Sequence, residues 1–260
     1  MLDKIVEIAK KAGKFLKDNE GKISEINQKG SFTNLVTNID KGSETLIKNF
    51  IVKKFPDHGI LAEESGATLP TSEYRWIIDP LDGTTNYTHS YPVYCVSIGV
   101  EYKGEVIAGA VYDPNFDELF SAEKGSGAFM NGEKLKVTST ESLERSLLAT
   151  GFPYDIKNNP FNCIQHFNEF LLKAQAIRRL GSAALDICYV AAGRMDGFWE
   201  VNLHPWDTAA AVLITAEAGG KVTDFTGGKY SIYQKNILLS NGLIHEEMIE
   251  VLKKNFKVGS

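Results

Sequence analysis

The chain has 260 residues, of which 43% are hydrophobic and 23% charged, and its 33 acidic and 28 basic side chains leave a net charge of −5. This composition excludes a disordered chain, and at about 100–200 residues per domain the length allows one large domain or two tightly joined halves. Because the sequence has no basic tail or stripe, a nucleic-acid substrate is disfavoured.

The N-terminus and the cysteines predict an intracellular protein. The segment from Met1 to Lys4 alternates charged with apolar residues, so it resembles neither a signal peptide nor a membrane span. Cys95, Cys163 and Cys188 are widely spaced and form no C-x-x-C pair, which favours a reducing compartment over a zinc or redox site. We therefore expect a cytoplasmic protein without a membrane segment.

The first predicted element is a helix over residues 2–17, where apolar residues recur at i, i+3, i+4 and i+7 with lysines on the other face. Residues 20–37 are polar and rich in Gly and Asn, which predicts a hairpin or mobile loop with Lys29-Gly30-Ser31 at its tip. A second amphipathic helix carries Leu46 through Phe55. The apolar run Trp76-Ile77-Ile78 then predicts a buried strand with Asp79 at its C-terminal end.

From residue 93 to 137 short β-type runs alternate with turn signals, which predicts a meander of antiparallel strands. After about residue 145 helices and strands alternate. The expected helices cover 160–173, 182–192, 206–218 and 244–254, and the expected strands cover 196–200, 220–223 and 237–240. We predict an N-terminal α+β half over 1–143, with the antiparallel sheet and a metal site, and a C-terminal α/β half over 144–260 that completes the site. Helices should cover the sheets in layers.

The strongest chemical signal is Asp-Pro-Leu-Asp-Gly-Thr-Thr-Asn at residues 79–86. Its two carboxylates follow a buried strand and precede a turn that should open into a helix. Clustered carboxylates attract hard divalent cations, and Mg²⁺ prefers oxygen ligands. Gly83 and Thr84 also offer backbone N–H groups at a helix start, where phosphate binds well. Asp-Gly is a common turn sequence, so the segment alone leaves a plain turn open.

Other polar clusters have simple structural interpretations when each is taken alone. Glu63 and Glu64 fit a solvated loop, and both Asp40 and Asp207 look like helix caps. Glu200 fits an exposed strand position as well as it fits a functional role. Arg178-Arg179 fits a solvated face but could also steer an anionic substrate, and the histidines are interpreted as surface or structural residues.

In combination, these motifs resemble the inositol monophosphatase family of lithium-sensitive phosphatases. Glu-Glu at 63–64, Asp-Pro-x-Asp-Gly-Thr at 79–84, Trp-Asp at 206–207 before a small-residue helix, and Glu-Ala-Gly-Gly at 217–220 occur in the family's order. The resemblance runs from the first helix to the last. It implies a mixed α+β and α/β fold, the layered αβαβα sandwich of the sugar-phosphatase type, and a Mg²⁺-dependent phosphatase.

The resemblance also implies a role for each matching residue. Two to three Mg²⁺ ions would be held by Glu63, Asp79, the Leu81 carbonyl, Asp82 and Asp207, with Asp79 bridging two ions and Glu63 reaching a third through water. Asp40 and Thr84 would pair to orient or deprotonate the water that attacks directly, without a covalent nucleophile. Substrate contacts are implied at Gly83, Thr84, Gly181, Ser182, Ala183 and Glu200, together with Asp82 and Asp207. Lys29 matches the mobile loop that closes over the site.

Gly-Thr-Thr-Asn at 83–86 resembles the inositol monophosphatase branch, so inositol 1-phosphate leads among small phosphorylated polyols. The family also includes phosphatases for fructose 1,6-bisphosphate, histidinol phosphate, NADP and 3′-phosphoadenosine 5′-phosphate. It is commonly dimeric, which implies a homodimer. Some bacterial relatives act as partners in transcription complexes, so a regulatory role stays open. A phosphatase with an aspartyl nucleophile in D-x-D-G-T is disfavoured, because two residues separate Asp79 from Asp82.

Overall fold

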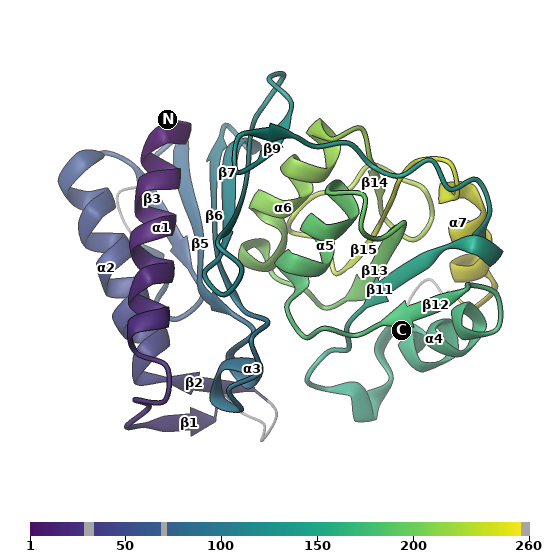
Figure 1. Cartoon of the computed structure of the whole chain (residues 1–260), viewed down its shortest axis with the longest axis horizontal. Coiled ribbons are helices and arrows are strands. Elements are labelled where there is room, and N and C mark those ends of the chain that lie inside the picture. The colour runs from purple at the N-terminus through teal and green to yellow at the C-terminus, as the bar shows by residue number, and fades with distance from the viewer. Residues whose placement is uncertain (29–33, 69–71, 256–260) are drawn as a thin grey trace.

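The computed structural model describes residues 1–28, 34–68 and 72–255, and its helices and sheets alternate in layers (Figure 1). From left to right in Figure 1, α1 and α2 cover a larger sheet, α5 and α6 lie between the two sheets, and α4 and α7 cover the far face of the smaller sheet. This is the predicted αβαβα sandwich, and the fold class is confirmed. The helices are α1 (Leu2–Asp18), α2 (Asn38–Lys54), α4 (Cys163–Leu171), α5 (Ala183–Ala191), α6 (Pro205–Glu217) and α7 (His245–Asn255).

The larger sheet has eight strands in the order β10-β9-β8-β7-β6-β5-β3-β4. Its strands pair antiparallel except for β3 and β5, which run parallel. The predicted meander is confirmed, whereas β3 and β4 were not predicted. The strands are β3 (Gly59–Ala62), β4 (Gly66–Thr68), β5 (Tyr74–Asp82), β6 (Cys95–Tyr102), β7 (Glu105–Asp113), β8 (Glu118–Glu123), β9 (Ala128–Met130) and β10 (Glu133–Lys134).

The smaller sheet has five strands in the order β12-β11-β13-β15-β14. Strand β11 is parallel to both of its neighbours, and β15 is antiparallel to both of its own. The three strands β13, β14 and β15 confirm the predicted ones, while β11 and β12 were not predicted. The strands are β11 (Leu147–Thr150), β12 (Ala176–Arg178), β13 (Gly197–Val201), β14 (Lys221–Thr223) and β15 (Asn236–Ser240). The predicted division at 143/144 falls between the two sheets in the sequence and stays a prediction.

The polar segment after α1 forms the predicted hairpin, with β1 (Ile26–Gln28) antiparallel to β2 (Leu35–Thr37). Its predicted tip, Lys29-Gly30-Ser31, lies outside the described residues. Helix α2 begins directly after β2, and Thr37 is its N-cap: the Thr37 hydroxyl accepts the Ile39 N–H at 3.0 Å. Asp40 stands three residues further on, where its carboxylate accepts the Thr37 N–H at 2.8 Å. The interpretation of Asp40 as the N-cap is therefore wrong, because Asp40 closes a capping box from inside the helix.

Small residues allow α6 to pack directly on the larger sheet. A Cβ atom on Gly109 would lie 2.8 Å from the Ala210 Cα atom, and one on Gly99 would lie 3.0 Å from the Ala209 Cβ atom. The absence of a side chain at both glycines is what permits this approach. Helix α6 therefore has a fixed position between the sheets, and its N-terminus carries Asp207.

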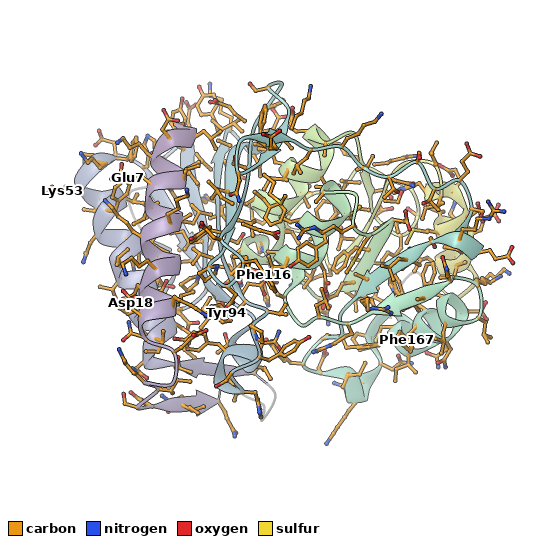
Figure 2. The ribbon with its side chains drawn as sticks, viewed as in Figure 1. Glu7, Asp18, Lys53, Tyr94, Phe116 and Phe167 are labelled. Carbon is orange, nitrogen blue, oxygen red and sulfur yellow. The ribbon has the colours of Figure 1, made fainter. Side chains whose placement is uncertain are left out.

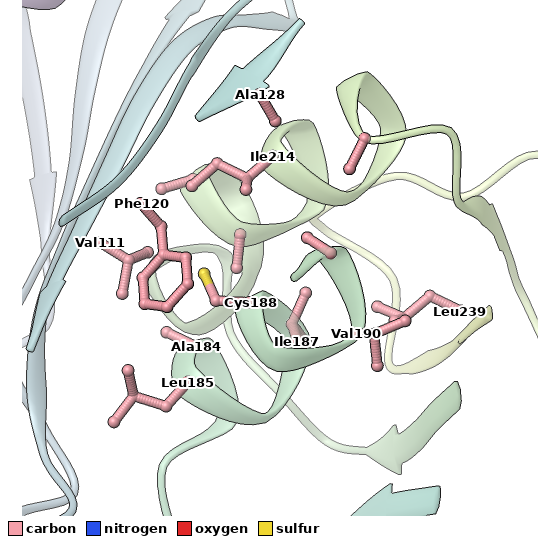
Figure 3. Close-up of a cluster of buried hydrophobic side chains, with 14 of the residues drawn as sticks. Val111, Phe120, Ala128, Ala184, Leu185, Ile187, Cys188, Val190, Ile214 and Leu239 are labelled. Carbon is pink, nitrogen blue, oxygen red and sulfur yellow. The ribbon is translucent and has the colours of Figure 1, made fainter. Parts of the chain in front are cut away.

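The core around α5 and α6 joins the two sheets into one packed body. Figure 3 shows Val111 and Phe120 of the larger sheet on the side of α5 that carries Cys188, and Leu239 of the smaller sheet beside Val190 on the other side of this helix. Burying this apolar surface stabilises the contact by about 25 cal/mol per Å². A rigid contact of this kind is needed for any site that takes side chains from both sheets.

Polar side chains cover the outside of α1 and α2, including Glu7, Asp18 and Lys53 (Figure 2). The three cysteines are buried and free, as their spacing predicts. In the part of the chain that the structure describes, no helix is both long and apolar enough to cross a membrane.

Candidate active site

A cleft of about 550 Å³ opens between the larger sheet and the N-terminal ends of α5 and α6. Every predicted metal and substrate residue lines it, although these residues are up to 144 positions apart in the sequence (207 − 63). They are Glu63, Asp79, Leu81, Asp82, Gly83, Thr84, Gly181, Ser182, Ala183, Glu200 and Asp207. Asp40 lies behind this wall and reaches the cleft through Thr84.

The C-terminal end of β5 delivers the first group of site residues. The pairing of β5 with β6 is interrupted between Asp79 and Asp82, and this irregularity turns both carboxylates toward the cleft. The Leu81 N–H donates to the Asp79 carboxylate at 3.0 Å. Gly83 follows with φ 94°, and a Cβ atom there would lie 2.8 Å from the Val93 carbonyl oxygen. Only glycine fits this turn, and it opens the short helix α3 (Thr84–Thr88) as predicted.

Asp82 connects the larger sheet to α5. One of its carboxylate oxygens, Oδ2, accepts the Ser182 hydroxyl at 2.6 Å and the Ala184 N–H at 2.8 Å. Ser182 is the N-cap of α5, so a carboxylate meets the positive end of this helix. The contact fixes the Gly181 to Ala183 segment against the predicted metal residues.

Asp40 and Thr84 form the predicted pair. The Thr84 hydroxyl donates to Asp40 Oδ1 at 2.9 Å and lies 3.1 Å from the Leu81 carbonyl oxygen. The other oxygen, Asp40 Oδ2, accepts the Thr37 hydroxyl at 2.5 Å. Asp40 is fully buried, and burial raises its pKa, while the hydrogen bonds from Thr37 and Thr84 act in the opposite direction.

Glu63 and Asp207 come from opposite sides of the cleft. Glu63 lies in the turn between β3 and β4, where its N–H donates to the Ile78 carbonyl at 3.1 Å; it is half-buried and so less solvated than expected. Asp207 accepts the His204 N–H at 2.6 Å from the third position of α6, so, like Asp40, it closes a capping box and is not itself the N-cap, which is His204. Because Asp207 also lines the cleft, the cap does not exhaust its role. The His204 ring stacks on Trp206, with centroids 4.8 Å apart.

The four acids act on one another electrostatically. Burial raises the pKa of Asp79 well above its ordinary value, and the charges of Glu63, Asp82 and Asp207 raise it further. Burial likewise raises the pKa of Asp207, with Glu63 as the next cause. Carboxylates held together in this way favour either a proton or a cation between them. An ion with oxygen ligands fits this set of donors.

Within residues 1–28, 34–68 and 72–255, no three His, Cys, Asp or Glu side chains lie close enough together to hold a metal ion by themselves. This arrangement still suits Mg²⁺, which keeps several waters and uses one or two carboxylates together with substrate phosphate oxygens. The donors present are carboxylates and a backbone carbonyl, which are the ligand types of hard cations.

The other end of the cleft holds residues whose role the sequence left open or did not indicate. Glu200 is only 8% exposed, so the exposed interpretation is wrong, and burial raises its pKa to about 8 while Arg179 opposes the shift. Arg179 is exposed, as predicted, but it also lines the cleft. The sequence analysis missed Gly151, Tyr154, Asp186 and Lys235. Of these only Asp186 carried a signal, since it lies four residues after Ser182 and so on the same face of α5.

Comparison with known proteins identifies the family. The model of the inositol monophosphatase family matches residues 1–256. The chain is 39% identical to an inositol-1-monophosphatase of Mesorhizobium japonicum, over 98% of this chain and 96% of that protein. It is 43% identical to the Nus factor SuhB of Escherichia coli K12, over 96% of this chain and 94% of that one. The crystal structure of the suhB protein of Bartonella henselae superposes with a TM-score of 0.93 at 41% identity and covers 98% of both chains.

The chain belongs to the inositol monophosphatase family. It is therefore a phosphoric monoester hydrolase, as the sequence resemblance implies. The inositol monophosphatase family is generally metal-dependent and acts on small phosphorylated substrates. The family match covers the strands of both sheets, so the residues on both sides of the cleft lie within the matched region.

Proposed function

We propose that this protein hydrolyses inositol 1-phosphate to inositol and phosphate in a Mg²⁺-dependent reaction. The observation that carries the proposal is that Glu63, Asp79, Asp82 and Asp207 line one cleft, which Asp40 reaches through its hydrogen bond with Thr84. Carboxylates and a phosphate ester both carry negative charge. These acids can therefore bind such an ester only when cations lie between them and the phosphate.

The metal-binding residues would be Glu63, Asp79, Asp82, Asp207 and the carbonyl of Leu81, holding two to three ions. When bound, Mg²⁺ would polarise the phosphate oxygens as a Lewis acid and would lower the pKa of water, which makes hydroxide available as the nucleophile. Asp79 would be the central residue of this set, because it is buried and the charges of the other three acids act on it. Its Leu81 N–H partner keeps the carboxylate oriented.

Thr84 and Asp40 would prepare the attacking water. The Thr84 hydroxyl donates its hydrogen bond to Asp40 Oδ1, so the lone pairs of its oxygen remain free to accept a hydrogen bond from water. The Thr37 contacts hold Asp40 Oδ2, so the carboxylate cannot rotate away. No covalent intermediate is required.

The remaining cleft residues would hold the ester. The N–H groups of Gly83 and Thr84 would bind phosphate oxygens, and Glu200 would contact the polyol hydroxyls. The segment Gly181, Ser182 and Ala183 lies beside Asp82 and would also contact the polyol. Asp82 and Asp207 would contact the polyol as well.

A turnover panel tests the substrate. The panel compares inositol 1-phosphate, fructose 1,6-bisphosphate, histidinol phosphate, NADP and 3′-phosphoadenosine 5′-phosphate, each with Mg²⁺ and with EDTA. We expect the highest kcat/KM for inositol 1-phosphate, loss of activity with EDTA and inhibition by Li⁺. A preference for another member of the panel would reassign the substrate while keeping the phosphatase.

A second candidate role is regulatory, and the relative named Nus factor SuhB favours it. In this role the protein would bind a partner in a transcription complex, with or without turnover. Affinity purification with the wild type and with Asp40→Asn separates the two roles, since a regulatory contact should survive loss of catalysis. We also propose a cytoplasmic homodimer, which sedimentation would detect as twice the mass of one chain.

A further inference from the structure

Asp186 is an acid in the cleft that the proposed reaction leaves without a role. Its side chain is 1% exposed, and its Oδ1 atom has no hydrogen-bond partner. A buried acceptor without a donor is destabilising, because the group has lost its water and gained nothing in return. Since Asp186 lines the cleft, a donor can arrive with a bound molecule.

Helix α5 places Asp186 beside the substrate. Ser182 caps this helix, and the Asp186 N–H donates to the Ser182 carbonyl at 3.0 Å, so the two residues stand one turn apart on one face. The Ser182 hydroxyl already touches Asp82 at 2.6 Å. Asp186 therefore lies on the polyol side of the metal residues and not among them.

Glu200 lies in the same part of the cleft, against Gly151, the residue that directly follows β11. A Cβ atom on Gly151 would lie 2.3 Å from Glu200 Oε1 and 2.4 Å from Glu200 Oε2. The Glu200 carboxyl thus occupies the volume that any other side chain at position 151 would fill. Glycine at this position draws Glu200 back from the centre of the cleft and makes room for a substrate ring.

We infer that Asp186 is a specificity-determining residue that accepts a hydrogen bond from a substrate hydroxyl next to the one bound by Glu200. The inference rests on the proposed function and names its substrate class, a monophosphate whose leaving group is uncharged and carries neighbouring hydroxyls. Two buried carboxyl groups at this end offer acceptors to hydroxyl groups, whereas a second phosphate would need donors or cations of its own. Arg179, which lines the same cleft, lies near both acids.

The test measures kcat and KM of Asp186→Asn for inositol 1-phosphate and for p-nitrophenyl phosphate, which has no hydroxyls to recognise. We expect KM for inositol 1-phosphate to rise about tenfold, the effect of losing one buried hydrogen bond, with kcat nearly unchanged. The kcat/KM for p-nitrophenyl phosphate should stay within about twofold of the wild type. Activity toward fructose 1,6-bisphosphate should gain relative to inositol 1-phosphate.

Asp113→Asn is the matched control, because Asp113 is also fully buried with an unpaired carboxylate oxygen but lies on β7 outside the cleft. It should keep the wild-type preference. Gly151→Ala is a second probe that leaves Asp186 intact, and by displacing Glu200 it should raise KM for inositol 1-phosphate selectively. Equal losses on both substrates, or no change on either, in a folded Asp186→Asn would overturn the inference. A wild type that hydrolyses p-nitrophenyl phosphate but not inositol 1-phosphate would instead refute the proposed substrate.

Discussion

At the scale of single residues, Asp40 has a structural and a chemical contact on the same carboxylate. Its Oδ2 atom closes the capping box of α2, and its Oδ1 atom accepts from Thr84. The sequence predicted the pair with Thr84 through the family resemblance, but it placed the cap at the wrong residue. The error has a physical reason: Thr37 and Asp40 are both good residues for a helix start, and only the backbone geometry separates the N-cap from the third helical position.

Asp40→Asn is expected to lower kcat by about 10²–10⁴-fold, the usual contribution of general-base assistance. The amide oxygen can still accept the Thr37 N–H, so the melting temperature should change little. The amide nitrogen would then donate to the Thr84 hydroxyl, so that this hydroxyl would lose the carboxylate that accepts its hydrogen bond and holds its orientation toward the attacking water. Measurement of kcat, KM and melting temperature checks this expectation.

Thr84→Ala combined with Asp40→Asn tests whether the two residues act as one unit. We expect the double variant to be hardly slower than either single variant, because residues of one unit have non-additive effects. Losses that multiply would show that Asp40 and Thr84 act separately. Near-normal kcat in Asp40→Asn alone would remove Asp40 from the mechanism.

At the scale of elements, the spacing of apolar residues and the turn signals predicted the long helices and the antiparallel meander. Strands β11 and β12 were missed because they have four and three residues, too few for a pattern to emerge. Strand β3 was missed for the same reason, and so the half-buried position of Glu63 in the turn after it was not expected. Gly151, Arg179 and Asp186 could not be placed from the sequence, since their common cleft depends on contacts between β11, the segment before α5, and α5 itself.

Helix α7 contains a buried histidine that should make stability depend on pH. His245 is fully buried, and its ring nitrogens lie 2.9 Å from the Thr223 and Ser240 hydroxyls. Burial lowers its pKa from 6.5 to about 4. A pKa lower in the folded than in the unfolded chain gives stability that is complete above pH 6.5 and lost as the pH falls toward 4. The loss should amount to roughly 3 kcal/mol at most.

Denaturant unfolding of the wild type and His245→Gln between these pH values measures this contribution. The variant should lose less free energy of unfolding on acidification, even if it is less stable at every pH. His89→Gln is the control, because His89 is exposed at the end of α3, and it should keep the wild-type slope. Parallel curves for the wild type and His245→Gln would rule out this role for His245.

At the scale of the whole molecule, the cleft exists only because the two sheets are held together through α5 and α6. Asp79 and Asp82 come from the larger sheet, Glu200 from the smaller, and Asp207 from the helix packed between them. The order of the sequence motifs allowed this convergence to be expected, since the family resemblance spans the chain. What the motifs could not supply was the packing that fixes it, such as the approach of Ala210 to Gly109.

The central claim, that carboxylates from across the molecule bind Mg²⁺ for phosphate ester hydrolysis, is tested most directly by the Mg²⁺ dependence of Asp207→Asn. Asparagine keeps an oxygen for the His204 N–H, so α6 stays capped, but it removes one charge from the site. We predict that EDTA abolishes turnover of inositol 1-phosphate by the wild type, and that the variant needs a higher Mg²⁺ concentration and recovers part of its activity there. Turnover that survives EDTA, or an Asp207→Asn variant with wild-type turnover and the wild-type Mg²⁺ dependence, would contradict the account.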